Sequence, residues 1–303
     1  MISAKDFLGL KDVPLETIES ILQSAAGMKQ AFLTSKKLDT LSGKSVVILF
    51  YENSTRTKMS FELAAKNLSA NVTALTVAQS SVAKGESLID TGKTLDALKT
   101  DLIVIRHQMA GAPHLLAANV EAGVINGGDG MNEHPTQALL DMFTIREKFG
   151  SFKGLKVLIA GDIKHSRVAR SNIWGLTKAG AAVTVCAPRT LMPDGIERTG
   201  VRVAANLKEG AAGADVLMAL RLQLERQKAG LFPSMNEYNH LFNINDKIIR
   251  LADRNAIVMH PGPMNRGLEI SSKAADSSAS VITRQVTNGV AVRMALLDRL
   301  LNR

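Results

Sequence analysis

The chain has 303 residues, of which 46% are hydrophobic and 21% are charged. This composition is typical of a globular protein with about two domains, and it excludes a disordered, collagen-like or small disulfide-stabilised chain. The net charge of +9 indicates anionic partners, but the basic residues form no continuous run and aromatic residues make up only 4%. Because nucleic acids are bound through basic surfaces and aromatic stacking, small anionic ligands are favoured over nucleic acid.

The chain contains one cysteine, Cys186, so it cannot form an intramolecular disulfide or a multi-cysteine zinc site. No apolar stretch approaches the roughly 20 residues that a membrane helix needs. The first ten residues lack the apolar core of a secretory signal peptide. We therefore expect a cytoplasmic protein with no membrane partner.

Short β-branched runs alternate with longer amphipathic stretches in the first half of the chain, which is the signature of βαβ units. A helical pattern begins at Pro14, and the continuous apolar run at 45–51 is typical of a buried parallel strand. The elements expected after this strand are helix 55–68, strand 71–77, helix 88–99, strand 101–106, short strand 124–126 and helix 134–149.

A second series of elements follows a glycine-bearing turn at 149–154. Its expected elements are strands 156–160, 182–187, 201–204, 215–219 and 257–260, helix 168–179, and a closing amphipathic helix 285–301. We predict an α/β protein of two domains, 1–149 and 150–284, each with a mostly parallel sheet flanked by helices. The C-terminal helix, within 285–303, is expected to return to the first domain. Ligands are expected where the carboxyl ends of the strands meet.

Ser54, Thr55, Arg56 and Thr57 lie directly between the first apolar strand and a helix. Free backbone N–H groups and the positive end of the helix dipole favour an anion at such a position. Arg56 adds a planar fork of donors that matches phosphate oxygens. Ser54 or Thr55 alone would be an ordinary helix N-cap. A cation in the first helical turn opposes the dipole, however, so Arg56 favours an anion-binding site.

A second candidate cluster contains His134, Pro135 and Gln137 after a glycine-rich stretch. Proline suits the first turn of a helix, and the three-residue spacing places His134 and Gln137 on one helical face. A capping or core histidine is an equally good interpretation of His134 by itself. No second ligand stands at metal-binding spacing, so we expect no metal here.

Arginines occur at strand or helix ends in both halves of the chain, namely Arg56, Arg106, Arg167 and Arg221. Together they predict a cleft for substrates with several negative charges. A dinucleotide site is not expected, because Gly161 is the one glycine where the fingerprint needs three. Since no nucleophile with an adjacent base is evident, the expected chemistry is positioning and electrostatic stabilisation.

Two further segments have weaker signals. Lys84 lies in a polar stretch that is typical of a solvated loop tip. The run from His260 to Pro263 follows the last expected strand, and its two prolines and one glycine fix an unusual backbone. Such a backbone is suited to presenting main-chain carbonyls to a ligand.

These motifs resemble those of the catalytic chains of the aspartate carbamoyltransferase family, over essentially the whole length. The matching segments are FYENSTRTKMSFE, SSVAKGES, VIRH, GGDGMNEHPTQALLD, GDIKHSRVARS, RLQLER and HPGPMNRGLEI. The Ser-Thr-Arg-Thr and His-Pro-Thr-Gln elements belong to the wider aspartate/ornithine carbamoyltransferase superfamily. The segments at 84–86 and 221–223 are the ones that point to aspartate.

The resemblance implies a reaction in which carbamoyl phosphate and L-aspartate give N-carbamoyl-L-aspartate and phosphate, in de novo pyrimidine (UMP) biosynthesis. It implies that the first domain binds carbamoyl phosphate, that the second binds aspartate, and that no metal or organic cofactor takes part. It also implies a homotrimer with shared active sites, in which Ser80 and Lys84 enter the site of the adjacent subunit.

The resemblance further implies a role for each matching residue. The residues implied for carbamoyl phosphate are Ser54, Thr55, Arg56, Thr57, Arg106, His134, Gln137, Pro261 and Gly262. Those implied for the aspartate carboxylates are Lys84, Arg167, Arg221 and Gln223, and those implied in catalysis are Arg56, Thr57, Lys84, Arg106 and His134. Some members of the family carry leucine in place of Gly262. A contact through the main-chain carbonyl would tolerate this difference, whereas a side-chain packing role would not.

Two alternatives remain open. The acceptor could be another amino acid such as ornithine, although the ornithine branch typically has a Ser-Met-Gly loop and a His-Cys-Leu-Pro turn. A catalytically silent scaffolding homologue would have no need of the complete arginine set. Regulatory chains and a dihydroorotase are candidate partners that the sequence neither requires nor excludes.

Overall fold

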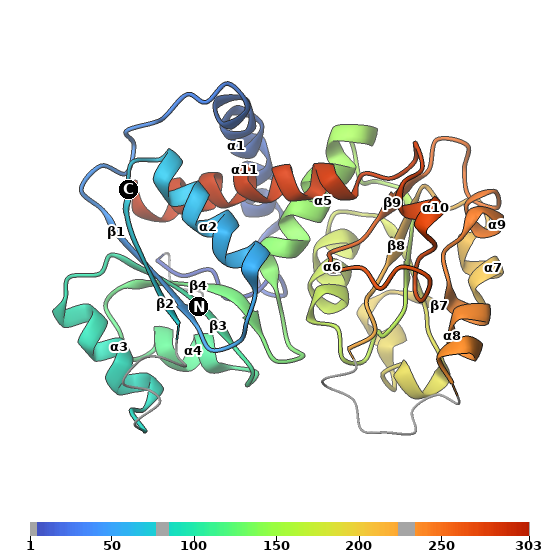
Figure 1. Cartoon of the computed structure of the whole chain (residues 1–303), viewed down its shortest axis with the longest axis horizontal. Helices are drawn as coiled ribbons and strands as arrows, with labels where there is room; N and C mark the ends of the chain where they lie inside the picture. The colour runs from blue at the N-terminus through green and yellow to red at the C-terminus, as the bar shows by residue number, and fades with distance from the viewer. Residues whose placement is uncertain (1–4, 77–84, 224–233, 303) are drawn as a thin grey trace. The chain divides into compact units, whose positions relative to one another are not determined.

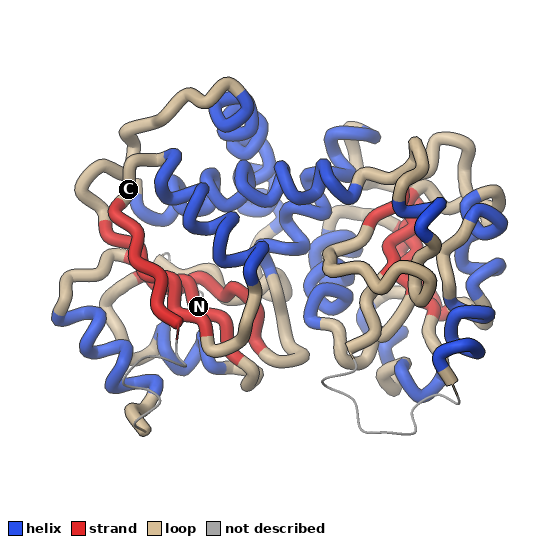
Figure 2. Tube along the Cα trace, in the orientation of Figure 1, coloured by secondary structure: helices blue, strands red, loops and turns tan. Residues whose placement is uncertain are grey.

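The computed structural model describes residues 5–76, 85–223 and 234–302. The chain divides into two compact units. The N-terminal unit comprises Met1–Leu140 and Thr287–Arg303, and the C-terminal unit comprises Asp141–Val286. The chain passes between the units within two helices, α5 (Pro135–Phe149) and α11 (Ile282–Leu301). Figures 1 and 2 show the helices and strands of both units.

The N-terminal unit contains a parallel sheet with the strand order β2-β1-β3-β4. Its strands are β1 (Ser45–Phe50), β2 (Asn71–Thr76), β3 (Leu102–His107) and β4 (Gly123–Asp129). Its other helices are α1 (Leu15–Leu33), α2 (Thr55–Asn67), α3 (Leu88–Ala97) and α4 (Ala112–Ala117). Helices α1, α2 and α11 lie on one face of this sheet, and α3 and α4 lie on the other (Figure 1).

The central strands of this sheet are buried on both faces. Val47 and Ile103 pack on one face with Leu95 of α3 and Leu116 of α4. The next residues along the strands point to the opposite face, and Ile48 is fully buried there. Burial on both faces explains why β1 has a continuous apolar run instead of an alternating one.

The C-terminal unit contains a second parallel sheet with the order β7-β6-β5-β8-β9. Its strands are β5 (Lys156–Ala160), β6 (Ala182–Cys186), β7 (Arg202–Val203), β8 (Val216–Ala219) and β9 (Ile257–Met259). Its helices are α6 (Arg167–Lys178), η3 (Arg189–Leu191), η4 (Ile196–Thr199), α7 (Leu207–Ala211), α8 (Met235–Phe242), α9 (Asp246–Ile249) and α10 (Ser272–Ala275). Helix α6 lies on one face of the sheet, and α7, α9 and α10 lie on the other (Figure 1).

The core of the C-terminal unit includes the single cysteine. Cys186 ends β6 and packs with Leu158, Leu207 and Val258 in one apolar cluster. Burial raises the pKa of the Cys186 thiol to about 12, with a smaller contribution from the negative charge of Glu209. The thiol is therefore protonated near neutral pH, which makes it a structural residue and not a nucleophile.

The predicted fold class is confirmed, because both units contain a parallel sheet flanked by helices. Within the described ranges, no helix is long and apolar enough to cross a bilayer.

Candidate active site

The candidate residues of the N-terminal unit follow three adjacent strands of its sheet. Ser54 to Thr57 follow β1, Arg106 lies near the end of β3, and His134 follows β4. Phe50, the last residue of β1, is directly paired with Arg106. Because parallel strands present their carboxyl ends at one edge of a sheet, these residues share the edge at which α/β proteins bind ligands.

Ser54 to Thr57 form the beginning of α2. Ser54 is in the N-cap position, but its side chain makes no capping hydrogen bond, and the first turn contains no acidic residue. Among the described residues, none gives the side chains of Ser54, Thr55, Arg56 or Thr57 a hydrogen bond or an ion pair. Partial burial lowers the pKa of the Arg56 guanidinium. This helix start therefore presents hydroxyls, backbone N–H groups and a cation to an anion.

Arg106 is held by two contacts from neighbouring segments. Its Nε lies 3.3 Å from Oε2 of Glu52, and the two side chains are only 13% and 20% exposed. Its Nη1 donates to the carbonyl oxygen of Gly127 at 3.3 Å. These contacts fix the guanidinium at the end of β3, beside the loop that leads to α2.

His134 stands immediately before α5, where its carbonyl oxygen accepts hydrogen bonds from the N–H groups of Gln137 at 3.0 Å and Ala138 at 3.2 Å. Pro135 is the first residue of the helix, as its fixed φ favours. The side chains of His134 and Gln137 are both buried. His134 is therefore the N-cap of α5 by its backbone, which leaves its imidazole to a different role.

The candidate residues of the C-terminal unit also follow adjacent strands. Arg167 begins α6, which follows β5, and Arg221 and Gln223 follow β8. Strands β5 and β8 are paired. Asp162, which is fully buried, connects the two segments: its Oδ1 lies 2.8 Å from Nδ1 of His165, and its Oδ2 accepts the N–H of Gln223 at 3.4 Å.

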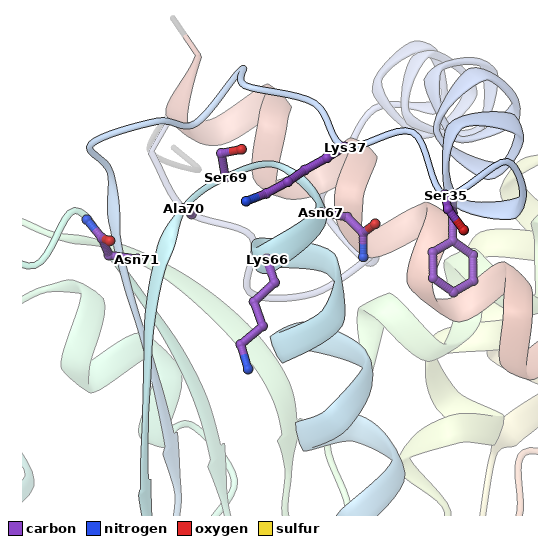
Figure 3. A pocket seen from close by; sticks show the side chains of 8 residues that line it. Ser35, Lys37, Lys66, Asn67, Ser69, Ala70 and Asn71 are labelled. Atoms are coloured by element: carbon purple, nitrogen blue, oxygen red, sulfur yellow. The ribbon is translucent and has the colours of Figure 1, made fainter.

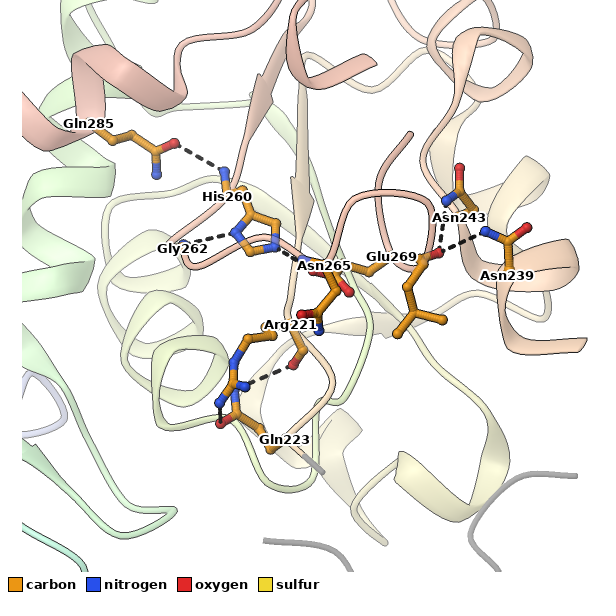
Figure 4. Close-up of polar contacts among 10 residues, drawn as sticks. Arg221, Gln223, Asn239, Asn243, His260, Gly262, Asn265, Glu269 and Gln285 are labelled. Atoms are coloured by element: carbon orange, nitrogen blue, oxygen red, sulfur yellow. Dashed lines mark hydrogen bonds and ion pairs between the residues drawn. The ribbon is translucent and has the colours of Figure 1, made fainter. Parts of the chain in front are cut away.

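Arg221 and Gln223 contact each other at the end of β8 (Figure 4). The Nη2 of Arg221 donates to Oε1 of Gln223 at 3.2 Å, and the Nε2 of Gln223 donates to the carbonyl oxygen of Arg221 at 3.3 Å. Both side chains are half-buried. The pair is thus a pre-arranged group of donors that suits a carboxylate.

The turn after β9 is organised by His260 (Figure 4). Its backbone N–H donates to Oε1 of Gln285 at 3.0 Å, and its Nδ1 accepts the N–H of Gly262 at 2.8 Å. Since Nδ1 is an acceptor, the proton lies on Nε2, which donates to Glu269 at 3.1 Å. Gly262 has φ +68, a conformation that glycine adopts without strain. His260 therefore holds Pro261 and Gly262 in place.

Two predicted residues, Ser80 and Lys84, lie outside the described residues. The structure places the other candidates in two groups. Arg56, its neighbours Ser54, Thr55 and Thr57, and Arg106, His134 and Gln137 belong to the N-terminal unit, whereas Arg167, Arg221, Gln223, Pro261 and Gly262 belong to the C-terminal unit.

A separate hollow of about 590 Å³ lies elsewhere in the N-terminal unit (Figure 3). Its lining residues are Phe32, Ser35, Lys37, Lys66, Asn67, Ser69, Ala70 and Asn71. Asn67 ends α2 and Asn71 begins β2, so the hollow is at the amino-terminal edge of the sheet. It is therefore at the opposite edge from Arg56 and does not belong to the candidate site.

Sequence reasoning missed Glu52 and Asp162, which hold candidate residues in place. The signal that could have identified them is their position in the sequence: Glu52 lies two residues before Ser54, and Asp162 lies two residues after the end of β5. Within the described part of the chain, no group of three or more His, Cys, Asp or Glu side chains is arranged to hold a metal ion.

Comparison with known proteins identifies both units. Residues 5–147 match the model of the "Aspartate/ornithine carbamoyltransferase, carbamoyl-P binding domain". Residues 153–300 match the "Aspartate/ornithine carbamoyltransferase, Asp/Orn binding domain". The chain belongs to the aspartate/ornithine carbamoyltransferase family.

Relatives within this carbamoyltransferase family cover the whole chain. The aspartate carbamoyltransferase catalytic subunit of Acetivibrio thermocellus is 61% identical, over 100% of this chain and 97% of that subunit. The corresponding subunit of Caldanaerobacter subterraneus subsp. tengcongensis is 60% identical, over 99% and 98% of the two chains.

Solved carbamoyltransferase structures have the same fold. Aspartate transcarbamoylase from Trypanosoma cruzi, in complex with N-(phosphonacetyl)-L-aspartic acid, has a TM-score of 0.89 and 32% identity, over 98% of this chain and 95% of that one. Ornithine carbamoyltransferase from Pyrococcus furiosus has a TM-score of 0.87 and 30% identity, over 98% and 96%. The fold alone therefore does not distinguish the two acceptor amino acids.

Proposed function

We propose that this chain is an aspartate carbamoyltransferase, which transfers the carbamoyl group of carbamoyl phosphate to the amine of L-aspartate in de novo pyrimidine biosynthesis. The observation that carries the proposal is the 61% identity, over the full chain, to an aspartate carbamoyltransferase catalytic subunit. The intact set of arginines at the carboxyl edges of both sheets supports an active enzyme over a silent scaffolding homologue.

The proposal divides the substrates between two domains. Residues 1–149, together with residues 285–303, bind carbamoyl phosphate, and residues 150–284 bind aspartate. The start of α2 binds the phosphate group of carbamoyl phosphate. No described protein group pairs with the donor side chains there, which are the hydroxyls of Ser54, Thr55 and Thr57 and the guanidinium of Arg56. A doubly charged phosphate satisfies these donors and complements the helix dipole.

The carbonyl of carbamoyl phosphate lies between Arg106, Thr57 and His134 in this proposal. As the amine attacks, the carbonyl oxygen becomes an oxyanion, and these donors stabilise it more strongly than the neutral carbonyl. Arg106 also bridges to the phosphate. Gln137 and the Pro261 carbonyl, with Gly262 beside it, bind the carbamoyl NH2 group.

Aspartate binds through its two carboxylates to Arg167, Arg221 and Gln223. The attacking amine must be neutral, and the surrounding cations lower its pKa because they disfavour the ammonium form. When the tetrahedral intermediate collapses, the C–O bond to phosphate breaks and the departing phosphate accepts the amine proton. The reaction therefore needs no protein base, and no metal or organic cofactor is proposed.

Aspartate rather than ornithine is the proposed acceptor, since Arg221 supplies a cation for a side-chain carboxylate. We expect purified protein to form N-carbamoyl-L-aspartate from carbamoyl phosphate and L-aspartate, and no citrulline from L-ornithine. Arg221→Ala is expected to raise the KM for aspartate about 10-fold, the value of one charged hydrogen bond, with little effect on the KM for carbamoyl phosphate. Citrulline formation would overturn the choice of acceptor, and no phosphate release with either amino acid would favour the scaffolding alternative.

We also propose a cytoplasmic homotrimer in which Ser80 and Lys84 complete the site of the adjacent subunit; regulatory chains and a dihydroorotase remain candidate partners. In a ring, each subunit both donates and receives such a segment.

Mixing two inactive variants tests the shared site. Arg56→Ala and Lys84→Ala are each expected to be nearly inactive alone. Mixed, dissociated and reassembled in equal amounts, they should recover activity in about a quarter of the sites. Reassembled trimers without activity would contradict shared sites while leaving the carbamoyltransferase assignment intact.

A further inference from the structure

One buried carboxylate connects the segments that carry Arg106 and His134. Asp129 ends β4 and is fully buried. Its Oδ2 accepts the N–H of Gly111 at 2.8 Å, in the turn that follows β3. Its Oδ1 accepts the N–H of Glu133 at 3.0 Å, in the residue immediately before His134. Asp129 therefore connects two loops at the candidate active-site edge of the sheet.

The remaining hydrogen-bonding capacity of Asp129 is filled by two asparagine side chains. The Nδ2 of Asn126 donates to Oδ1 at 2.8 Å, and the Nδ2 of Asn132 donates to Oδ2 at 3.1 Å. A buried carboxylate is costly unless such donors satisfy it, and each bond to a charged acceptor is stronger than a neutral one. The four hydrogen bonds therefore fix the carboxylate of Asp129 and the two loops that carry its donors in one arrangement.

The backbone confirms that the two loops are in close contact. The N–H of Gly130 donates to the carbonyl oxygen of His107 at 2.9 Å. Gly130 has φ +48, and a Cβ at this position would lie 2.8 Å from the carbonyl oxygen of Gln108. A larger residue would push the loops apart. The carbonyl of Gly127, two residues before Asp129, is the one that accepts from Arg106.

We propose that Asp129 is a positioning residue that fixes the placement of Arg106 relative to His134. The proposal rests on the proposed function, in which these two side chains stabilise the same carbonyl oxygen. Asp129 itself does not touch the substrate; it acts through the loop of Gly111 and the loop of Glu133. A displacement of about 1 Å in such donors costs up to 100-fold in rate.

Asp129→Asn tests this role at constant volume. All four partners of the carboxylate are donors, so the amide NH2 of asparagine would face N–H groups whichever way it is oriented. The variant therefore loses two hydrogen bonds and places donors against each other. Asp6→Asn is the matched control, because Asp6 is also buried and accepts the N–H of Val124 at 2.9 Å, near the opposite end of β4.

We expect Asp129→Asn to lower kcat by about 10-fold to 50-fold, while the inhibition constant of inorganic phosphate changes by less than about 3-fold. The split arises because the other proposed phosphate donors, Ser54 to Thr57, begin α2, which Asp129 does not contact. Of the proposed phosphate ligands only Arg106 would shift, so the phosphate constant changes little. Asp6→Asn is expected to lower Tm without changing kcat per folded molecule. If Asp129→Asn keeps the parental kcat, or if both substitutions lower kcat equally, the positioning role is wrong.

Amide hydrogen exchange tests the positioning role of Asp129 independently of the proposed carbamoyl transfer. The amides of Gly111 and Glu133 should exchange faster in Asp129→Asn than in the parent, whereas the amide of Val124 should not. If the parent protein transfers no carbamoyl group, the proposed function fails. Unchanged exchange at both amides overturns the positioning role independently.

Should Asp129→Asn not fold, Asn132→Ala provides a second test, because it removes one of the four donors. This variant is expected to lower kcat about 3-fold with the phosphate constant unchanged. An unaltered kcat in that variant also overturns the proposal.

Discussion

Replacing Arg56 by alanine is expected to reduce kcat/KM for carbamoyl phosphate by about 100-fold or more, the combined value of two charged hydrogen bonds. Folding should be almost unaffected, because Arg56 makes no described ion pair and no carboxylate is left unpaired by its removal. The substitution also removes an unfavourable cation from the first turn of α2. Tm is therefore expected to change by less than about 2 °C.

Steady-state kinetics and thermal unfolding of Arg56→Ala check this result. Lys66→Ala is a suitable control, because Lys66 lies in the last turn of the same helix and pairs with Glu62 at 2.7 Å. The control should retain full activity. Arg106→Ala would be a less specific test, since it leaves the mostly buried Glu52 without its cation. An unfolded Arg56→Ala protein whose remaining folded fraction has normal kinetics would show that Arg56 is structural.

Replacing His134 by alanine is expected to lower kcat by about 100-fold to 1,000-fold, as the loss of one oxyanion donor does in other enzymes. His134→Asn keeps a donor on a shorter side chain, so it should retain about 10-fold more activity than the alanine variant. The N-cap contacts of α5 come from the backbone carbonyl of His134. They survive both substitutions, so the two variants should be similarly stable.

The comparison of kcat in His134→Ala and His134→Asn distinguishes hydrogen bonding from proton transfer. His114→Ala provides a control, because His114 is exposed on α4 and lies outside the candidate site. Equal and complete loss of activity in both His134 variants would indicate that the imidazole transfers a proton. Loss of folding in both would instead indicate a structural role.

The fold was largely predictable because its strongest signals are local. The apolar run that became β1 is buried on both faces, and burial of this kind leaves an unambiguous pattern in the sequence. Helices α4, α7, α8, α9 and α10 were not predicted. The two shortest, α9 and α10, have four residues each, too few for a 3.6-residue periodicity to appear. Their available signals were the N-caps Asn245 and Ser271, which also occur in ordinary turns.

The candidate site was predictable where a residue is anomalous in its local context. Arg56 is such a residue, because a cation at a helix start opposes the helix dipole unless an anion is bound there. Asp129 is not anomalous in its local sequence, because an aspartate between two glycines is typical of a turn. Its importance comes from partners such as Gly111, which approach it only in the folded chain. The same is true of Asp162 and Gln223, which are brought together by the pairing of β5 with β8.

The placement of Arg221 and Gln223 has a consequence for how new specificities arise. Both residues belong to one loop after β8, in a unit different from that of the Ser54–Thr57 segment. If the proposed function holds, mutations in this loop would change which amino acid is accepted without disturbing the residues proposed for the activated donor. Selection for a new acceptor therefore acts on a short, separable stretch of sequence, and exchange of this loop is a practical starting point for engineering a different acceptor.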